Sequence, residues 1–469
     1  MRPSLLLLLC ASSAPGIVGC VDKTADTNPT VNGDDTGDSA PIDDSPVEGA
    51  SPAEDVTVVL SEFVSTVVIV TWTTAEPTVG FVRFGESISY TLVTPEETTP
   101  ATEHRVLLLG LPTEADAHLQ VVTRTEGGAT DESGDYSILT GPLPPQVPSI
   151  TVTGAVESWL GSYQVLPMQG AGYGVYVIDD QGRFVWFDQL EPGYNLMRAM
   201  LSNDGNYMMY CLAGQSDSLE LGSVMKVSMD GSERFIIPFP YLDHDMTELP
   251  DGTIAALEVT EHADYQGTAN AITELSADGT LTQIWSAWDD PVLMEFYVDG
   301  MNWTHANALD YEPEEDVYYI SLKEIGTLVK VDRQTGQSIW HLNGDANEFE
   351  MLNGSEKILM HHQFQILDGG ALFFDNGVPE RLYSQAVELV YDEVAMTAEE
   401  VWSYQHVPSM EVAAKGDVER FDDGNTQIVW STGGELQNVN PAGEVHWQFN
   451  TELGYAITFV QRVESLYGH

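Results

Sequence analysis

Hydrophobic and polar positions repeat along the chain from about residue 150 to its end. Each repeat holds an apolar, strand-like run, a tight turn with glycine, and an aromatic residue a few positions later. The copies are Asp180-Gln-Gly182 then Trp186, Asp230-Gly231 then Phe235, Asp278-Gly279 then Trp285, Thr335-Gly336 then Trp340, and Ala442-Gly443 then Trp447, with a degenerate copy near Thr397 before Trp402. The first four glycines advance by 49, 48 and 57 residues, and the degenerate copy divides the last step of 107.

A second turn signature lies about half a period away from the first. It reads Asn203-Asp-Gly205, Pro250-Asp-Gly252, Leu367-Asp-Gly369 and Asp422-Asp-Gly424, with Pro313-Glu-Glu-Asp316 in its place in the third repeat. Two hairpin turns per period indicate a four-stranded antiparallel unit. Six such units predict an all-β, six-bladed β-propeller over residues 148–469. A pair of β-sandwiches is the alternative, but sandwiches do not keep one signature in register over six periods.

Residues 56–147 have a different β pattern. Short, β-branched and roughly alternating runs are separated by clusters of Pro, Gly, Asp or Thr, and Trp72 lies early among them. The pattern resembles a fibronectin type III-like sandwich. It contains no group of residues suited to catalysis, so we expect a spacer or docking module.

The first 55 residues read as a targeting segment and a tether. Arg2 precedes the apolar run Leu5–Leu9, and the run ends at Ile17-Val18-Gly19-Cys20, which looks like a bacterial lipobox. This resemblance implies a lipoprotein signal peptide over residues 1–19 and lipidation of Cys20; an ordinary secretory peptide is the alternative. Residues 20–55 are acidic and polar, which predicts a disordered tether. We expect an exported protein, lipid-anchored to the bacterial cell envelope on the periplasmic or surface side of an outer membrane.

The charge composition argues against two classes of binding partner. The 469 residues include 73 Asp and Glu against 17 Lys and Arg, a formal charge of −56. Such a surface repels polyanions, which argues against nucleic-acid binding and against docking on anionic lipid. Of the three cysteines, only Cys211 would remain as a free thiol in the mature protein, and its apolar surroundings predict a buried, inert side chain.

Three histidines occupy one equivalent place in consecutive repeats. His244 and His361 lie eight residues before Gly252 and Gly369, and His305 lies eight before the matching Pro313. Equivalent positions on neighbouring blades face the same axis, so the three imidazoles should meet at one mouth of the central channel. A coincidence of unrelated strand histidines is the alternative. His341 and His406 follow blade tryptophan positions and are expected to be packing residues.

Two kinds of chemistry fit a histidine cluster. Three imidazoles can bind zinc or copper, with Asp243 and Asp245 as possible oxygen ligands. Alternatively, one neutral imidazole can act as a nucleophile while the others orient it and move protons. Spacing alone does not decide between them.

At these histidines the sequence resembles the bacterial arylsulfate sulfotransferases, which are exported six-bladed propellers. The likeness covers roughly residues 150–469 and is carried by His244-Asp-Met-Thr-Glu-Leu-Pro-Asp-Gly252, Trp303-Thr-His-Ala-Asn-Ala-Leu-Asp-Tyr311, the segment Ile320 to Gly336, His361-His-Gln-Phe-Gln-Ile-Leu-Asp-Gly369 with Phe374-Asp-Asn-Gly377, and Gly416-Asp-Val-Glu-Arg-Phe-Asp-Asp-Gly-Asn425. The resemblance implies transfer of a sulfuryl group from a phenolic sulfate ester to a phenol through a sulfohistidine, without a nucleotide sulfate donor, cofactor or metal.

The same resemblance implies roles for individual residues. His361 matches the histidine that becomes sulfated, His244 and His305 match its catalytic partners, and Asn307 matches a polar neighbour in the substrate site. Lys323 stands where the family usually has arginine, and it keeps the charge without the bidentate fork. His362 follows the nucleophile where a small or acidic residue is usual. If the strand register differs by one residue, His362 faces the channel instead of His361.

Two other hypotheses stay open at this level. The chain could be a non-catalytic surface propeller that binds a ligand at the channel mouth. It could also be a metal-dependent hydrolase or lyase built on the histidines.

Overall fold

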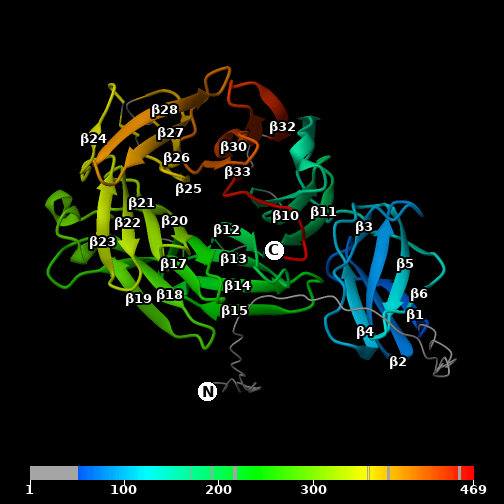
Figure 1. Ribbon diagram of the computed structural model, residues 1–469. Coiled ribbons are helices and arrows are strands. Elements are labelled where there is room, and N and C mark those ends of the chain that lie inside the picture. Colours follow the sequence, from blue (N-terminus) through cyan, green and yellow to red (C-terminus); the bar gives the residue numbers. More distant parts are fainter. Residues whose placement is uncertain are drawn as a thin grey trace, which may run out of the picture. The chain divides into compact units, whose positions relative to one another are not determined.

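The computed structural model describes residues 51–170, 172–191, 193, 195–214, 219–355, 357–358, 360–377, 381–452 and 456–468 (Figure 1). The predicted signal peptide, Cys20 and most of the predicted tether lie outside these residues. In the described part of the chain, no helix has the length and apolar character that a bilayer span requires.

Six antiparallel sheets follow one another around a ring, as the repeat pattern predicts (Figure 1). Blade 1 holds β9 (Tyr163–Gln169), β10 (Gly174–Asp179) and β11 (Phe184–Gln189). Blade 2 holds β12 (Asn195–Leu201), β13 (Tyr207–Ala213), β14 (Ser223–Ser228) and β15 (Arg234–Pro238). Blade 3 holds β16 (Leu242–Glu248), β17 (Ile254–Glu261), β18 (Thr268–Leu275) and β19 (Leu281–Ser286). The prediction of a six-bladed propeller is confirmed.

The other three blades repeat this order from the axis outward. Blade 4 holds β20 (Ala306–Glu312), β21 (Val317–Leu322), β22 (Thr327–Asp332) and β23 (Gln337–Leu342). Blade 5 holds β25 (Phe364–Leu367), β26 (Gly370–Asp375), β27 (Gln385–Asp392) and β28 (Thr397–Gln405), with β24 (Glu350–Met351) pairing to β28. Blade 6 holds β29 (Asp417–Arg420), β30 (Thr426–Trp430), β31 (Glu435–Val439) and β32 (Val445–Thr451). Short 3-10 turns connect some of these strands: η1 (Glu157–Trp159), η2 (Leu219–Leu221), η3 (Ala287–Asp289), η4 (Leu293–Phe296) and η5 (Ser431–Gly433).

The two ends of this domain close the ring by exchanging strands. β8 (Ile150–Gly154) pairs with β32 and completes blade 6 from outside. β33 (Ala456–Ile457) and β34 (Gln461–Val463) pair with β9 and complete blade 1 on its axial side. The first and last blades are therefore held together by main-chain hydrogen bonds from both directions.

The aromatic residue of the repeat packs between neighbouring blades. Trp186 of blade 1 is fully buried, and its Nε1 donates to the carbonyl oxygen of Met229 in blade 2. Trp285 of blade 3 likewise donates to the hydroxyl of Ser338 in blade 4. In blades 1 and 3 a large apolar ring with one hydrogen-bonding atom thus fills the space between two neighbouring sheets, whereas Phe235 of blade 2 is exposed.

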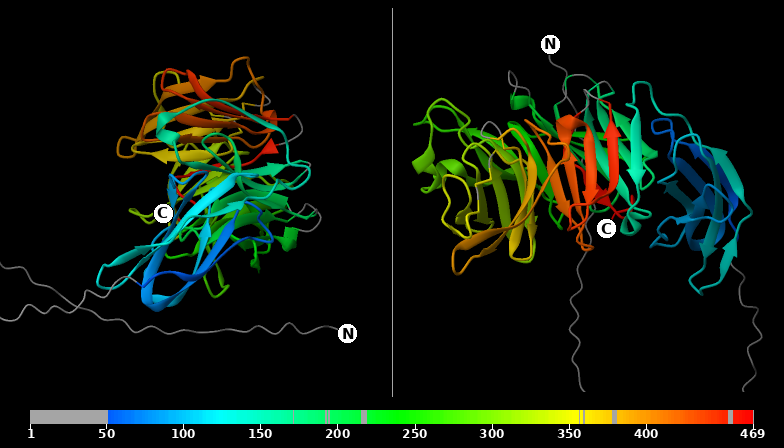
Figure 2. Two further views of the ribbon diagram at one scale, coloured as in Figure 1. Left: turned by 90° about the vertical axis from the view of Figure 1, so that its right-hand side faces the viewer. Right: turned by 90° about the horizontal axis from the view of Figure 1, so that it is seen from above.

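A seven-stranded β unit precedes the ring, and Figure 2 shows both parts from two further sides. Its strands are β1 (Glu54–Leu60), β2 (Val68–Gly85), β3 (Leu92–Val93), β4 (Ala101–Leu108), β5 (Asp116–Arg124), β6 (Thr130–Glu132) and β7 (Tyr136–Leu139). Trp72 is buried and stacks on His104 with ring centroids 4.7 Å apart. The Tyr467 hydroxyl donates to Leu107 O and accepts from Leu109 N, which ties this unit to the end of the chain. The fibronectin type III-like assignment stays a prediction.

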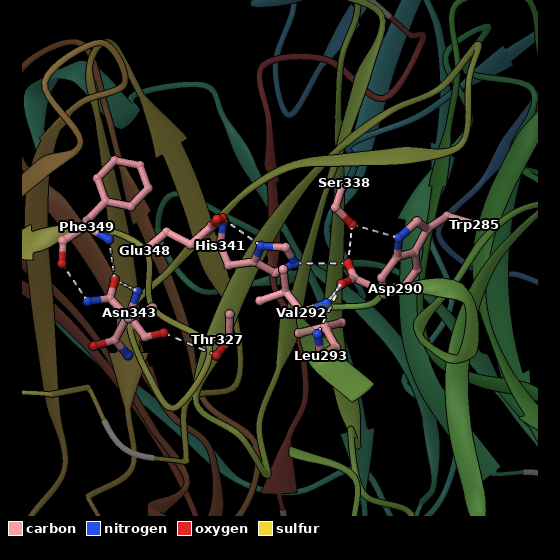
Figure 3. Close-up of polar contacts among 11 residues, drawn as sticks. Trp285, Asp290, Val292, Leu293, Thr327, Ser338, His341, Asn343, Glu348 and Phe349 are labelled. Atoms are coloured by element: carbon pink, nitrogen blue, oxygen red, sulfur yellow. Dashed lines mark hydrogen bonds and ion pairs between the residues drawn. The ribbon is translucent and has the colours of Figure 1, made fainter. Parts of the chain in front are cut away.

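His341 joins blade 4 to the loop after blade 3, through two carboxylates (Figure 3). Its Nε2 lies 2.9 Å from Asp290 Oδ2 and its Nδ1 lies 2.8 Å from Glu348 Oε2. Burial opposes the charged imidazole, but the hydrogen bonds to both carboxylates outweigh burial and raise the pKa of His341. This histidine therefore keeps its proton to a higher pH than a free imidazole does, and its contacts give it a structural role.

We predict that His341→Gln destabilises the fold by about 2 to 3 kcal/mol near pH 6. A raised folded-state pKa gives stability that is complete below the unfolded value of about 6.5 and is lost as the pH rises through the folded value. The loss measured by urea unfolding should therefore be smaller at pH 9 than at pH 6. His446→Gln, which changes an exposed imidazole, is the control. An equal loss at both pH values would contradict the assignment.

Candidate active site

The inner strands of blades 3, 4 and 5 bring the predicted histidines to one face of the ring. His244 lies near the start of β16, and His305 directly precedes β20. The rings of these two histidines are 5.1 Å apart. The equivalence drawn from the repeats therefore holds for this pair.

Asp243 orients His244. The Nδ1 of His244 lies 2.5 Å from Asp243 Oδ1, and Asn270 Nδ2 donates to Asp243 Oδ2 over 3.0 Å. Burial acts to raise the pKa of Asp243, but the charge and hydrogen bond of His244, with smaller effects of His305 and Asn270, hold it below its ordinary value. A carboxylate bound to Nδ1 leaves Nε2 of His244 available to exchange a proton.

His305 is a neutral imidazole in this environment. The residue directly precedes the first strand of blade 4, and its backbone φ of +45° lies in the left-handed region. Burial, followed by the positive charges of His244 and Lys323, lowers the pKa of His305 to about 4. Its Nδ1 is 3.8 Å from Glu324 Oε1, so the ring has only a distant carboxylate.

The third histidine whose surroundings include this pair is His362, the alternative that the sequence left open beside His361. The positive charges of His244, Lys323 and His305 act on His362 and, after the larger effect of burial, hold its pKa well below its usual range. None of these three residues contributes to the pKa shift of His361. The register therefore differs by one residue from the one that the spacing predicts.

The length of the following turn explains the difference. In blade 3, Leu249 N donates to Thr253 O, so three residues form the turn. In blade 5, Leu367 pairs directly with Gly370, so only two residues form it. Counted from the leucine before each turn, His244 and His362 both lie five residues upstream. Counting eight residues back from the glycine selects His361 instead, because the turn of blade 5 is one residue shorter than the turn of blade 3.

Asn376 determines which nitrogen of His362 carries the proton. The Asn376 side-chain nitrogen donates to the carbonyl oxygens of Val412 and Lys415, so its Oδ1 faces His362 Nδ1 at 2.7 Å. An amide oxygen only accepts hydrogen bonds, so Nδ1 is protonated and Nε2 holds a lone pair. The tetrad of His244, His305, His362 and Lys323 is called the histidine site below.

His361 lies on the other side of the segment, inside the protein. Its Nδ1 lies 2.6 Å from the Ser321 hydroxyl of blade 4, and its ring contacts the edge of Phe373. Asn307 donates to the His361 carbonyl oxygen over 3.1 Å, and both side chains are fully buried. These contacts make His361 and Asn307 part of the wall behind the histidine site.

Lys323 reaches the site immediately after β21. Its backbone nitrogen donates to His305 O over 3.2 Å, and its charge acts on both His305 and His362. Its ammonium also lies 3.2 Å from Glu324 Oε1, in a partly buried ion pair. The predicted cation is therefore present, but a carboxylate offsets its charge.

Buried carboxyl groups line the ring deeper along the inner strands. Arg198 of β12 pairs with Asp245 of β16 over 2.9 Å. Burial raises the pKa of Asp310 to about 6, of Asp417 to about 7 and of Glu419 to about 8. At pH 7 Glu419 is therefore mostly protonated and Asp417 about half protonated, while Asp310 is mostly ionised, so this part of the interior carries less negative charge than its composition indicates.

One residue near the histidine site, Asn376, was not singled out by the sequence. Asn376 stands in the quoted segment Phe374-Asp-Asn-Gly377, but only its contacts reveal its role. Cys211 is buried as expected, and its thiol donates to Asp243 O over 3.1 Å. Over the described ranges, no three His, Cys, Asp or Glu side chains are grouped as a metal ion requires.

The model of the arylsulfotransferase (ASST) family matches residues 167–433, more than half of the chain. No curated protein matches the sequence. A protein of unknown function from Bacteroides caccae is similar in structure, with a TM-score of 0.44 and 14% identity over 65% of this chain and 99% of that one. The periplasmic gluconolactonase of Pseudomonas aeruginosa gives 0.39 and 14% over 82% and 99%. Such low similarity carries no argument about function.

Proposed function

This chain belongs to the arylsulfotransferase family, and on that premise we propose that it transfers a sulfuryl group from a phenolic sulfate ester to a phenol, through a sulfohistidine and without a nucleotide donor. The observation that carries the proposal is the state of His362. It is a buried, neutral imidazole whose protonated nitrogen is held by Asn376, with two other imidazoles and a lysine beside it.

In the first half-reaction, His362 Nε2 attacks the sulfur of the donor. A nitrogen–sulfur bond forms as the bond between sulfur and the aryl oxygen breaks, and the phenolate leaves. A proton from His244, whose Nδ1 is held by Asp243, neutralises the phenolate. Because sulfuryl transfer resembles phosphoryl transfer, the protein acts mainly by positioning the group and stabilising its oxygens.

The second half-reaction reverses these roles. The acceptor phenol loses its proton to the now neutral His244, and its oxygen attacks the sulfur of sulfo-His362. The nitrogen–sulfur bond breaks, and His362 and His244 return to their starting states. His305, neutral at pH 7, donates or accepts a hydrogen bond at the reacting oxygens. Lys323 lies where it can contact a sulfonate oxygen, and Asn307 supports the segment from behind.

Two rival functions stay testable. A non-catalytic propeller would bind an aryl sulfate without turnover, and a metal-dependent enzyme would need a bound ion. The tautomer of His362 is not needed for ligand binding alone. A free lone pair on Nε2 would also suit a metal ligand, so chelation of the purified protein tests the metal-dependent enzyme.

We predict that the purified protein transfers sulfate from 4-nitrophenyl sulfate to phenol, measured by release of nitrophenolate and by sulfated phenol in the product. Dialysis against a chelator should leave the rate unchanged. Binding without turnover would support the non-catalytic propeller. A rate that is lost on dialysis and restored by zinc would support the metal-dependent enzyme.

We also predict that His362→Ala lowers the transfer rate by at least about 10³-fold, because it removes the nucleophile. Donor-only incubation of the wild type should add the mass of one sulfuryl group, and the variant should lack it. His361→Gln is the matched control, because it changes the adjacent imidazole and can still hydrogen-bond Ser321. An adduct that persists in His362→Ala but disappears in His361→Gln would restore the original assignment.

Export and anchoring complete the proposal, and they rest on the sequence alone. The lipobox-like segment supports lipidation of Cys20 on the bacterial cell envelope. Cells expressing the protein should incorporate labelled fatty acid into it, and Cys20→Ser should release an unlabelled protein from the membrane fraction. A wild-type protein without label would exclude the lipid anchor.

A further inference from the structure

One cation in the described part of the chain has no carboxylate partner. The sequence has 17 lysines and arginines, of which Arg2 and Lys23 lie outside the described residues. Each of the others except Lys415 makes at least one ion pair within 4.0 Å. In a chain with 73 acidic residues, a lysine without a carboxylate partner is the exception.

Lys415 belongs to the inner face of blade 6, next to the histidine site. It precedes Gly416, the residue that the repeats place in blade 6 where blades 3 and 5 carry His244 and His362. Its carbonyl oxygen accepts from Asn376 Nδ2 over 2.8 Å, and Asn376 Oδ1 holds His362. One amide side chain therefore connects the lysine backbone to the proposed nucleophile.

The surroundings of Cys211 indicate where the Lys415 ammonium lies. Its charge acts on the thiol of Cys211 in β13 of blade 2, and blade 1 separates blades 2 and 6. An ammonium between blades 5 and 6 would not reach that thiol. Cys211 in turn donates to Asp243 O, beside His244. The lysine thus approaches the same channel from the wall opposite blade 3.

An ammonium group that is partly buried without a counter-charge destabilises the fold, which indicates that it has a function. Burial lowers the pKa of Lys415 to about 8, and a desolvated charge without a partner is destabilising. The acidic groups around this contact do not neutralise the lysine. The pKa values of the Cys211 thiol and of the Asp417 carboxyl are raised. The other two carboxylates already have partners, since Asp245 pairs with Arg198 and Asp243 with His244. An anionic ligand would supply the missing counter-charge.

We propose that Lys415 binds the sulfonate oxygens of the donor ester, and that this single uncompensated cation selects monoanionic sulfate esters over dianionic phosphate monoesters. The proposal rests on the proposed function and deepens it. Lys323 brings no net charge because Glu324 pairs with it, so Lys415 supplies the net positive charge of the channel. A phosphate monoester is largely dianionic at pH 7, and its second charge would be buried without a partner.

Binding and turnover are measured separately. Isothermal titration with 4-methylbenzenesulfonate, a monoanion that cannot transfer its sulfonyl group, reports binding. Transfer from 4-nitrophenyl sulfate reports turnover, and 4-nitrophenyl phosphate reports selectivity. The variants are Lys415→Met and Lys415→Arg, with Lys323→Met for comparison. Lys357→Met is the control, because Lys357 is an exposed lysine paired with Asp345.

Lys415→Met should raise the Kd for the sulfonate at least about 10-fold and lower kcat/KM for the sulfate ester about 10²-fold. Lys323→Met should have the smaller effect on binding, and Lys357→Met none. In the wild type, binding should weaken as the pH rises through about 8, because the ammonium loses its proton. Lys415→Arg should bind well and lack this loss, because guanidinium stays charged.

An unchanged Kd in Lys415→Met, or an unchanged alkaline loss in Lys415→Arg, would overturn the proposal. If Lys415→Met does not fold, the pH profile of Lys415→Arg decides. If the wild type binds the sulfonate but transfers nothing, the proposed function fails while the role of Lys415 is still measured. Equal rates with the phosphate ester would exclude the selectivity.

Discussion

The exchange of strands between the two ends of the propeller is the constraint on which the site depends. β8 completes blade 6, and β33 and β34 complete blade 1, so the inner strands are held in a closed ring by main-chain hydrogen bonds. The exchange joins the two ends of the domain and leaves each blade only a short edge at the axis and another at the rim. It also fixes the distances between blades 3, 4 and 5, from which every residue of the histidine site comes, and their distance from blade 6, which carries Lys415.

Desolvation is the second force that shapes this molecule. A chain with a formal charge of −56 surrounds a channel in which His305 and His362 are neutral, Asp417 is about half protonated and Glu419 is mostly protonated at pH 7. Both effects have the same origin, since burial favours the uncharged form of acids and bases alike. The interior can therefore accept an anion that the outer surface repels.

Hydrogen bonds to neighbouring side chains decide which nitrogen atom of each histidine is free. Asp243 and Asn376 each hold the Nδ1 of one histidine, and the remaining Nε2 atoms are left for the reaction. Neither residue needs to touch the substrate to decide which nitrogen is protonated. This division between reacting and orienting residues is common to histidine-based catalysis.

The sequence by itself determined the all-β class and the six-bladed ring, because one turn and one aromatic residue recur from blade to blade. It also indicated a cluster of histidines, because three repeats carry histidine before the second turn. It also determined that His244 and His305 meet. Only the tertiary structure decided between His361 and His362, because blade 5 has a turn one residue shorter than blade 3, and one residue reverses the face that a strand side chain occupies. It also decided that Lys323 is paired while Lys415 is not. Ion pairs form between residues brought together by folding, and Lys415 meets its surroundings across a channel whose other wall lies some two hundred residues earlier in the chain.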